Sequence, residues 1–269
     1  TRNIFEALQR QQGLATLAQQ TAANAAPGVA NTISPAAACG ATSLAGLLGE
    51  ACMPSLTQAQ LTSMYTQPGQ TWAGLGIDSG LADDTIYVSR RADTSGTQKS
   101  FEAVIAKTIN GTAGGKSCAE DTDGFVSGTF VLNNTVADAV CNVAVPGDTT
   151  FNNSGSGQVI RCMDALQFRS LGSVGVLSTE YKQVAAGRIR FTKVAGWAPT
   201  HANVASGAYQ DYVDASLNTR LSATLPTASA PGYAAFLTLL KNSFANPATI
   251  DIINAGDQTF GPSGLMALD

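Results

Sequence analysis

The chain has 269 residues, which is enough for one large domain or two ordinary ones with a real core. Its net charge is −4 and only 13% of its residues are charged, so a nucleic-acid-binding surface is not expected. No apolar run approaches the roughly eighteen residues that a membrane span needs. No signal peptide is recognisable, so we expect any exported form to be a processed one.

The first predicted elements are two helices. The segment 2–20 has apolar residues at helical spacing, and an Ala-, Asn- and Pro-rich stretch follows it to about residue 38. A second helix begins after Thr57, which forms a capping box with Gln60. Its apolar face consists of Leu61, Met64 and Tyr65.

Residues 86–109 contain the stretch that points to a ligand. The segment 86–88 predicts a strand, and 96–109 predicts an amphipathic helix. A strand that leads into a helix N-terminus presents free N–H groups and the positive end of a helix dipole, and both suit an anion. Between the two elements lies the sequence RRADTSGT.

Each residue of this sequence has a chemistry suited to an anion. Arg91 carries a planar fork of donors that matches two oxygens of a tetrahedral oxyanion. Ser95 and Thr97 add hydroxyls that also cap the helix, and Gly96 allows close approach of the backbone. Asp93 is placed to brace the guanidinium of Arg91. An ordinary N-cap beside a surface arginine would explain the same residues without a ligand.

The sequence RRADTSGT closely resembles the ligand-binding segment of the periplasmic phosphate-binding proteins of ABC transporters. In that family an Arg, three residues and then Ser-Gly-Thr hold phosphate. The resemblance implies that Arg91 is the guanidinium ligand and that Asp93 pairs with it. It also implies that Ser95, Gly96 and Thr97 supply hydroxyl and amide donors.

The resemblance covers roughly residue 56 to the C-terminus and implies a fold. We expect an α/β periplasmic-binding-protein type II architecture with two lobes. Residues 1–205 would form the second lobe with the phosphate motif, and residues 206–269 the returning C-terminal part of the first lobe. The first lobe would be incomplete in this chain, because residues 1–55 do not supply the family's N-terminal phosphate loop or its acidic residue. Trp72 would pack near the motif, although it is also expected simply as a core aromatic.

The five cysteines favour an exported protein with disulfides. Cys39 and Cys52 flank a short segment and are the expected local pair. Cys118, Cys141 and Cys162 leave one partner over, so either one thiol is free or its partner lies outside this chain. Five buried cytosolic thiols remain the alternative.

The second half of the chain predicts further strands and helices. Segments 125–132, 140–145, 172–181, 188–194 and 209–213 are expected as strands. Residues 154–157, Ser-Gly-Ser-Gly, precede a helix with Val159, Cys162, Met163 and Leu166 facing inward. This turn is similar to a Gly/Ser-rich turn of the same family, but it is also an ordinary helix start, and no ligand role is assigned to it. Two more helices end the chain, the last opened by Asn246-Pro247.

Two further motifs do not support an enzyme. NGTAGGKS at residues 110–117 imitates a P-loop, but Asn110 stands at the first glycine position and a helix precedes it, so we predict a loop. His201 is the single histidine, without GxSxG or HExxH, and is expected in a loop or in packing. No catalytic residue, cofactor or metal site is predicted.

Three functions remain open. The leading hypothesis is a solute-binding protein, periplasmic or extracellular, that captures inorganic phosphate between two lobes for the membrane permease of an ABC importer. The alternative is an extracellular structural or assembly subunit that reuses the fold, with a second chain or fragment completing the first lobe. A secreted enzyme of phosphate metabolism is the weakest hypothesis, because catalytic residues are lacking.

Overall fold

The structure is a computed structural model, and it describes residues 1–25, 32–67, 69–92, 94–106, 149–178 and 188–212, with a few helical positions between 232 and 242. Its helices are α1 Arg2–Gln11, α2 Leu17–Asn24, α3 Leu44–Leu47, α4 Gln58–Thr66, α5 Gly96–Val104, α6 Ser156–Phe168 and α7 His201–Ala205. Its strands are β1 Ser55–Leu56, β2 Tyr87–Arg91, β3 Thr150–Asn153, β4 Ser173–Gly175 and β5 Lys193–Val194. Helices alternate with strands that pair in parallel, so the α/β class predicted from the sequence is confirmed.

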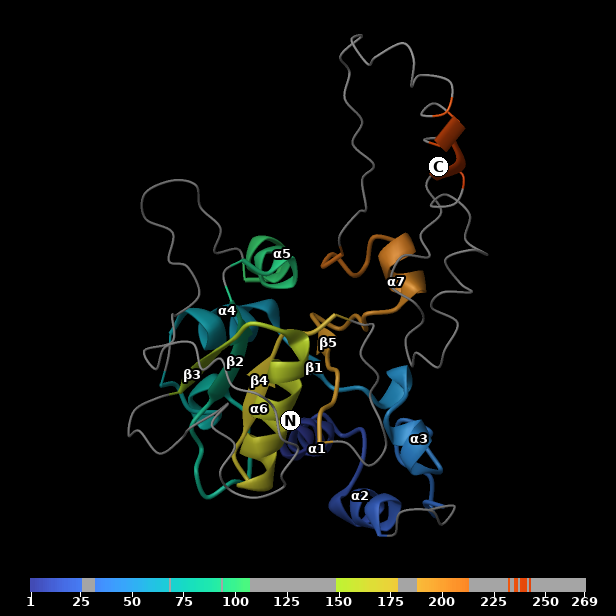
Figure 1. Cartoon of the computed structure of the whole chain (residues 1–269). Helices are drawn as coiled ribbons and strands as arrows, with labels where there is room; N and C mark the ends of the chain where they lie inside the picture. The colour runs from blue at the N-terminus through green and yellow to red at the C-terminus, as the bar shows by residue number, and fades with distance from the viewer. Residues whose placement is uncertain are drawn as a thin grey trace.

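The centre of the described fold is a three-stranded parallel sheet with the order β3-β2-β4 (Figure 1). The register pairs Arg91 with Asn153 on one side of β2 and Tyr87 with Ser173 on the other. The strand predicted at 86–88 is present as the central strand β2, although it begins at Tyr87 and continues to Arg91. A second, two-stranded parallel sheet pairs β1 with β5.

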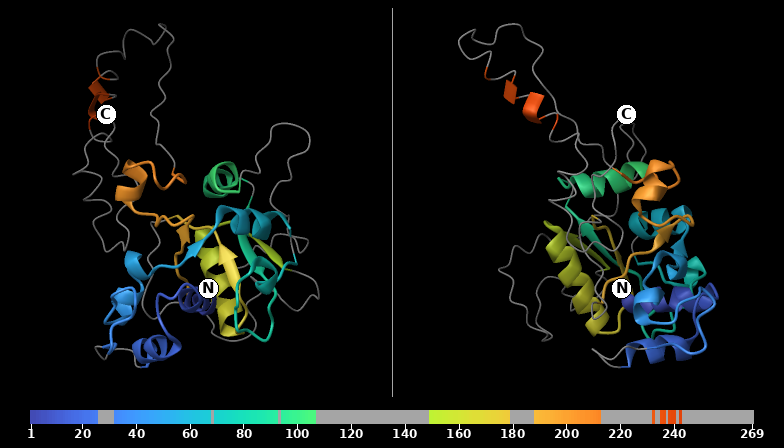
Figure 2. Two further views of the ribbon diagram at one scale, coloured as in Figure 1. Left: turned by 180° about the vertical axis from the view of Figure 1, so that it is seen from behind. Right: turned by 90° about the vertical axis from the view of Figure 1, so that its right-hand side faces the viewer.

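The two faces of β2 are buried by different helices. Val88 belongs to the largest core cluster, with side chains from α1, α4 and α5 that include Ile4, Tyr65 and Phe101. Its neighbour Tyr87 belongs instead to a cluster with Phe151 of β3 and with Cys162 and Leu166 of α6. Successive side chains of a strand point to opposite faces, which explains the division. The right-hand view of Figure 2 shows α6 on one side of the sheet and α1 and α4 on the other.

The helix predicted over residues 2–20 is wrong in its extent. The chain forms α1 and α2 instead, because Gly13 has a positive φ of 69° that a continuing helix does not allow. Thr16 and Gln19 form a capping box that starts α2 afresh. Leu17, an apolar residue within the predicted helix, is the first residue of α2 and is 63% exposed.

Several local predictions are confirmed. Thr57 and Gln60 form the capping box of α4, and the three residues of its predicted apolar face are buried. The four predicted inward residues of α6 are buried as well. Trp72 is completely buried in the core cluster of Val88. Cys39 and Cys52 form the expected disulfide, and Cys162 is also disulfide-bonded.

The strand predictions in the second half are only partly right. Of 188–194, only β5 is a strand, and residues 209–212 form none. Alternating apolar residues do not create a strand unless a neighbouring strand supplies hydrogen-bond partners, and β1 offers only two residues to pair with. The helix predicted over 96–109 is too long, because α5 ends at Val104 with Ile105 as its C-cap. The predicted strands at 125–132 and 140–145, the P-loop-like segment 110–117 and Asn246-Pro247 lie outside the described residues. In the part of the chain that the structure describes, no helix is both long and apolar enough to cross a membrane.

Candidate anion-binding site

The candidate site lies at the carboxyl edge of the three-stranded sheet. Because β2 and β3 run parallel with Arg91 opposite Asn153, both strands end at the same edge. Each then turns directly into a helix: β2 leads into α5 and β3 leads into α6. Ligands of parallel α/β sheets commonly bind outside the carboxyl ends of the strands, where helix N-termini gather.

The turn before α5 has the geometry that the sequence predicted. Ser95 is the N-cap residue, is buried, and its Oγ accepts a hydrogen bond from the N–H of Gln98 at 3.4 Å. The N–H groups of a first helical turn have no acceptor within the helix. Among the described residues, those of Gly96 and Thr97 donate to no protein group. Gly96 is exposed and Thr97 is half-buried.

The guanidinium of Arg91 points to the turn before α6. Its Nη1 donates to Ser156 Oγ at 2.6 Å, and its Nη2 donates to the carbonyl oxygen of Ser154 at 3.3 Å. Its Nε is buried and has no hydrogen-bond partner in the described structure. The structure thus brings together Arg91 and the Ser-Gly-Ser-Gly turn at residues 154–157, to which the sequence analysis gave no ligand role.

A buried polar network links Arg91, at the end of β2, to α5. Gln98, fully buried in α5, accepts the backbone N–H of Arg91 at 3.0 Å and donates to Glu102 at 3.2 Å. Glu102 Oε1 lies 3.5 Å from Nη2 of the buried Arg90, and its Oε2 lies 2.8 Å from Lys99 Nζ. The sequence analysis missed Gln98 and Glu102, although their i,i+4 spacing was a signal that they share one face of the helix.

Asp93, predicted to brace Arg91, lies outside the described residues. Its role therefore stays a prediction. Arg91, Ser95, Gly96 and Thr97, the four predicted ligands, all lie within one strand end and the first turn of one helix.

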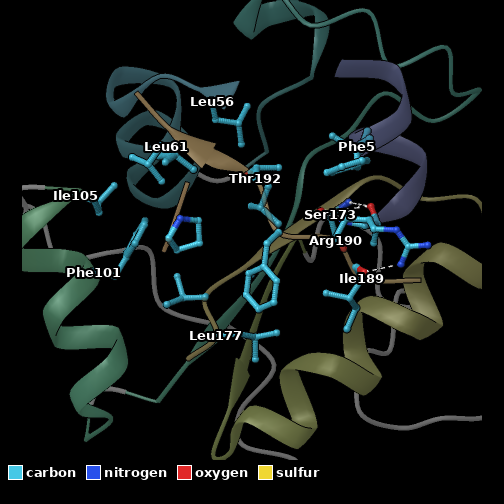
Figure 3. Close-up of a pocket in the computed structure, with 18 of the residues that line it drawn as sticks. Phe5, Leu56, Leu61, Phe101, Ile105, Ser173, Leu177, Ile189, Arg190 and Thr192 are labelled. Carbon is cyan, nitrogen blue, oxygen red and sulfur yellow. Dashed lines mark hydrogen bonds between the residues drawn. The ribbon is translucent and has the colours of Figure 1, made fainter. Parts of the chain in front are cut away.

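A separate cavity of about 120 Å³ is lined in part by α5 (Figure 3). Phe101 and Ile105 of α5, Leu61 of α4 and Leu56 of β1 give it a mainly apolar wall, and none of the four predicted ligands lines it. Arg190 is at the border of the cavity, and Figure 3 shows its guanidinium turned away from Phe101. The guanidinium donates a hydrogen bond to the Ile189 carbonyl at 2.7 Å.

The arginine at the border of this cavity is buried. Burial, followed by the charge of Arg2, lowers the pKa of Arg190 to about 10, against the opposing effect of Glu6 and Asp164. The lining of the cavity also includes the polar residues Ser173, Thr192 and Asp211.

Other chemistry finds little support in the described part of the chain. No group of three or more His, Cys, Asp or Glu residues there could hold a metal ion. His201 is the first residue of α7, a short helix with Thr200 as its N-cap.

Comparisons with known proteins give a limited result. No protein-family model and no curated protein matches the sequence. Among solved structures, one described as a phosphate ABC transporter substrate-binding protein with bound phosphate, from Clostridium perfringens, is 16% identical, with a TM-score of 0.42 over 78% of this chain. An ABC-type phosphate transport receptor from Vibrio cholerae is also 16% identical, with a TM-score of 0.43 over 75% of this chain. This chain spans 63% of the length of each. Similarity at this level assigns no ligand and no residue role.

Proposed function

We propose that this protein binds inorganic phosphate at the carboxyl edge of the β3-β2-β4 sheet, as the solute-binding component of an ABC phosphate importer. One observation supports the proposal: β2 and β3 run parallel, and the guanidinium of Arg91, four residues before the N-cap of α5, donates to the turn that begins α6. A phosphate there would receive the fork of Arg91, the hydroxyls of Ser95 and Thr97, and the amides of Gly96 and Thr97.

The electrostatics of the edge favour an anion. The guanidinium carries a permanent positive charge, and its contacts within the described residues are to the neutral oxygens of Ser154 and Ser156. The helix dipole of α5 adds partial positive charge at its first turn. A phosphate would compensate both charges at once, which a neutral ligand would not.

The proposal includes a partner protein and a cellular location. The bound phosphate would pass to the membrane permease of the importer, in the periplasm or outside the cell. Residues 1–205 would carry the phosphate motif, and residues 206–269 would return to a first lobe that closes over the anion. The Cys39–Cys52 disulfide supports an oxidising location.

The test is calorimetric titration of the protein with inorganic phosphate. Hydrogen bonds to a charged group contribute about 1.5–3 kcal/mol each, so Arg91→Ala should weaken binding by about tenfold or more. Arg10→Ala removes the same charge from α1, where the side chain donates to Gln20 at 2.8 Å, and should leave the affinity nearly unchanged. If the wild type binds no phosphate, or Arg91→Ala binds it equally well, the proposal is wrong.

A further inference from the structure

Ser156 lies where its hydroxyl could donate a hydrogen bond to the anion that Arg91 is proposed to bind. It would be a second serine ligand beside Ser95. It accepts a hydrogen bond from Arg91 Nη1 at 2.6 Å. A serine hydroxyl has one donor and two acceptor positions, so its proton remains to be donated. Within the described residues, no acceptor takes that proton. An anion attracted by Arg91 would therefore also lie within reach of the neutral hydroxyl donor of Ser156.

In the turn around Ser156, two backbone N–H groups have no acceptor inside the helix. Gln158 Oε1 accepts the N–H groups of Ser154 and Gly155, together with the hydroxyl of Ser154. This fixes the entry to α6 but does not cover the N–H groups of Ser156 and Gly157, which have no acceptor inside the helix. A Cβ added at Gly155 or Gly157 would meet nothing within 4 Å, so the space in front of this turn is open.

The charge of Arg91 also favours an anion at this place. Its Nε is buried without a hydrogen-bond partner in the described structure, as are seven other side-chain atoms, so it is the charge of the guanidinium that indicates an anion. No carboxylate among the described residues forms an ion pair with its guanidinium. A partly buried charge whose described contacts are neutral oxygens is costly unless an anion joins it.

We propose that Ser156 is a further ligand of the bound anion, so that the anion lies between the first turns of α5 and α6. Ser156 Oγ accepts from Arg91 and donates its proton to an anion oxygen, and the amides of Ser156 and Gly157 face the same anion. The inference rests on the proposed function of Arg91 and extends it. The binding surface then includes two helix N-termini, those of α5 and α6, and the guanidinium contacts the second of them.

The experiment compares two serines that stand two positions apart. Calorimetric titration with inorganic phosphate is carried out on the wild type, Ser156→Ala, Ser154→Ala and Arg91→Ala. Ser156→Ala should weaken phosphate binding by about tenfold or more, because it loses a hydrogen bond to a charged group. Ser154 contacts Arg91 only through its backbone carbonyl, which alanine keeps, so Ser154→Ala should stay within about twofold of the wild type.

A second pair of variants separates binding from folding. Ser156→Thr keeps the hydroxyl and should bind phosphate nearly as the wild type does. Ser156→Asp places a carboxylate at a helix N-terminus, which favours the helix, so the protein should keep its melting temperature. That carboxylate would occupy Arg91 and repel phosphate, so binding should be lost.

The outcomes are distinct. If Ser156→Ala binds within about twofold of the wild type while Arg91→Ala is weakened, Ser156 is not a ligand and the proposed function stands. The proposal for Ser156 also fails if Ser154→Ala loses as much affinity as Ser156→Ala, or if folded Ser156→Asp binds phosphate normally. A wild type that binds no phosphate overturns both proposals.

Discussion

Glu102→Gln should lower the free energy of unfolding by about 3 kcal/mol. Glu102 is only 2% exposed, and its Oε1 lies 3.5 Å from Nη2 of Arg90, which is 1% exposed. The substitution keeps the size of the side chain and a carbonyl acceptor, but it removes a negative charge that faces a buried guanidinium. Breaking a buried pair by removing one partner costs about 3–5 kcal/mol, and the long N–O distance places this pair at the lower end of that range.

Lys99→Ala is the matched control on the same helix. Lys99 Nζ is closer to Glu102, at 2.8 Å, but its side chain is 44% exposed. An exposed ion pair contributes at most about 1 kcal/mol, because water screens the charges and two long side chains lose freedom. The comparison therefore tests whether burial, and not the distance between the charges, decides the contribution of each pair.

Urea denaturation followed by far-ultraviolet circular dichroism measures both variants. The free energy of unfolding is extrapolated linearly to water, and an unchanged slope shows that the same surface is exposed in each. A loss below about 1 kcal/mol for Glu102→Gln, or equal losses for the two variants, would refute the reasoning, because a buried charge would then tolerate the loss of its partner.

Two further predictions concern packing and pH. Gly172→Ala should lower the free energy of unfolding by about 2 kcal/mol, because its Cβ would overlap the buried side chains of Trp72 and Ile4. Gly157→Ala is the control and should not lower the free energy of unfolding, because the space around its Cβ is open. Equal urea midpoints for the two variants would contradict this prediction. Burial raises the pKa of Asp211 above its usual 3.8, so wild-type stability should fall as pH rises through the window between the unfolded and folded pKa values. Asp211→Asn should therefore melt higher than the wild type at about pH 7 and lose that advantage near pH 3, and a difference independent of pH would disprove the assignment.

The sequence by itself determined the local features of this protein. Ser95 caps α5 and Thr57 caps α4, as predicted, because a cap depends only on a side chain and the amides two or three residues ahead of it. The inward face of α6 was predictable for a related reason, since helical spacing puts residues three and four apart on one side. Cys39 and Cys52 were the expected pair because a short loop costs little entropy to close.

Local patterns failed where an element depends on a distant partner. The alternation at 188–194 predicted a full strand, but only its last two residues pair, with β1. The helical spacing over 2–20 did not reveal that the chain turns at Gly13. In both cases the pattern was consistent with more than one structure, and tertiary packing selected one.

Only the tertiary structure brought Arg91 to the turn at 154–157. The sequence identified Arg91, Ser95, Gly96 and Thr97 as candidate ligands, because the chemistry of these residues and the resemblance to a ligand-binding segment are both contained in one short segment. It could not show that β3 lies beside β2, because strand pairing joins segments far apart in the chain and leaves no mark in either one alone. The pairing of Arg91 with Asn153 is what places Ser156 against the guanidinium, and this contact is the basis of the proposal that α6 also contributes to the anion site.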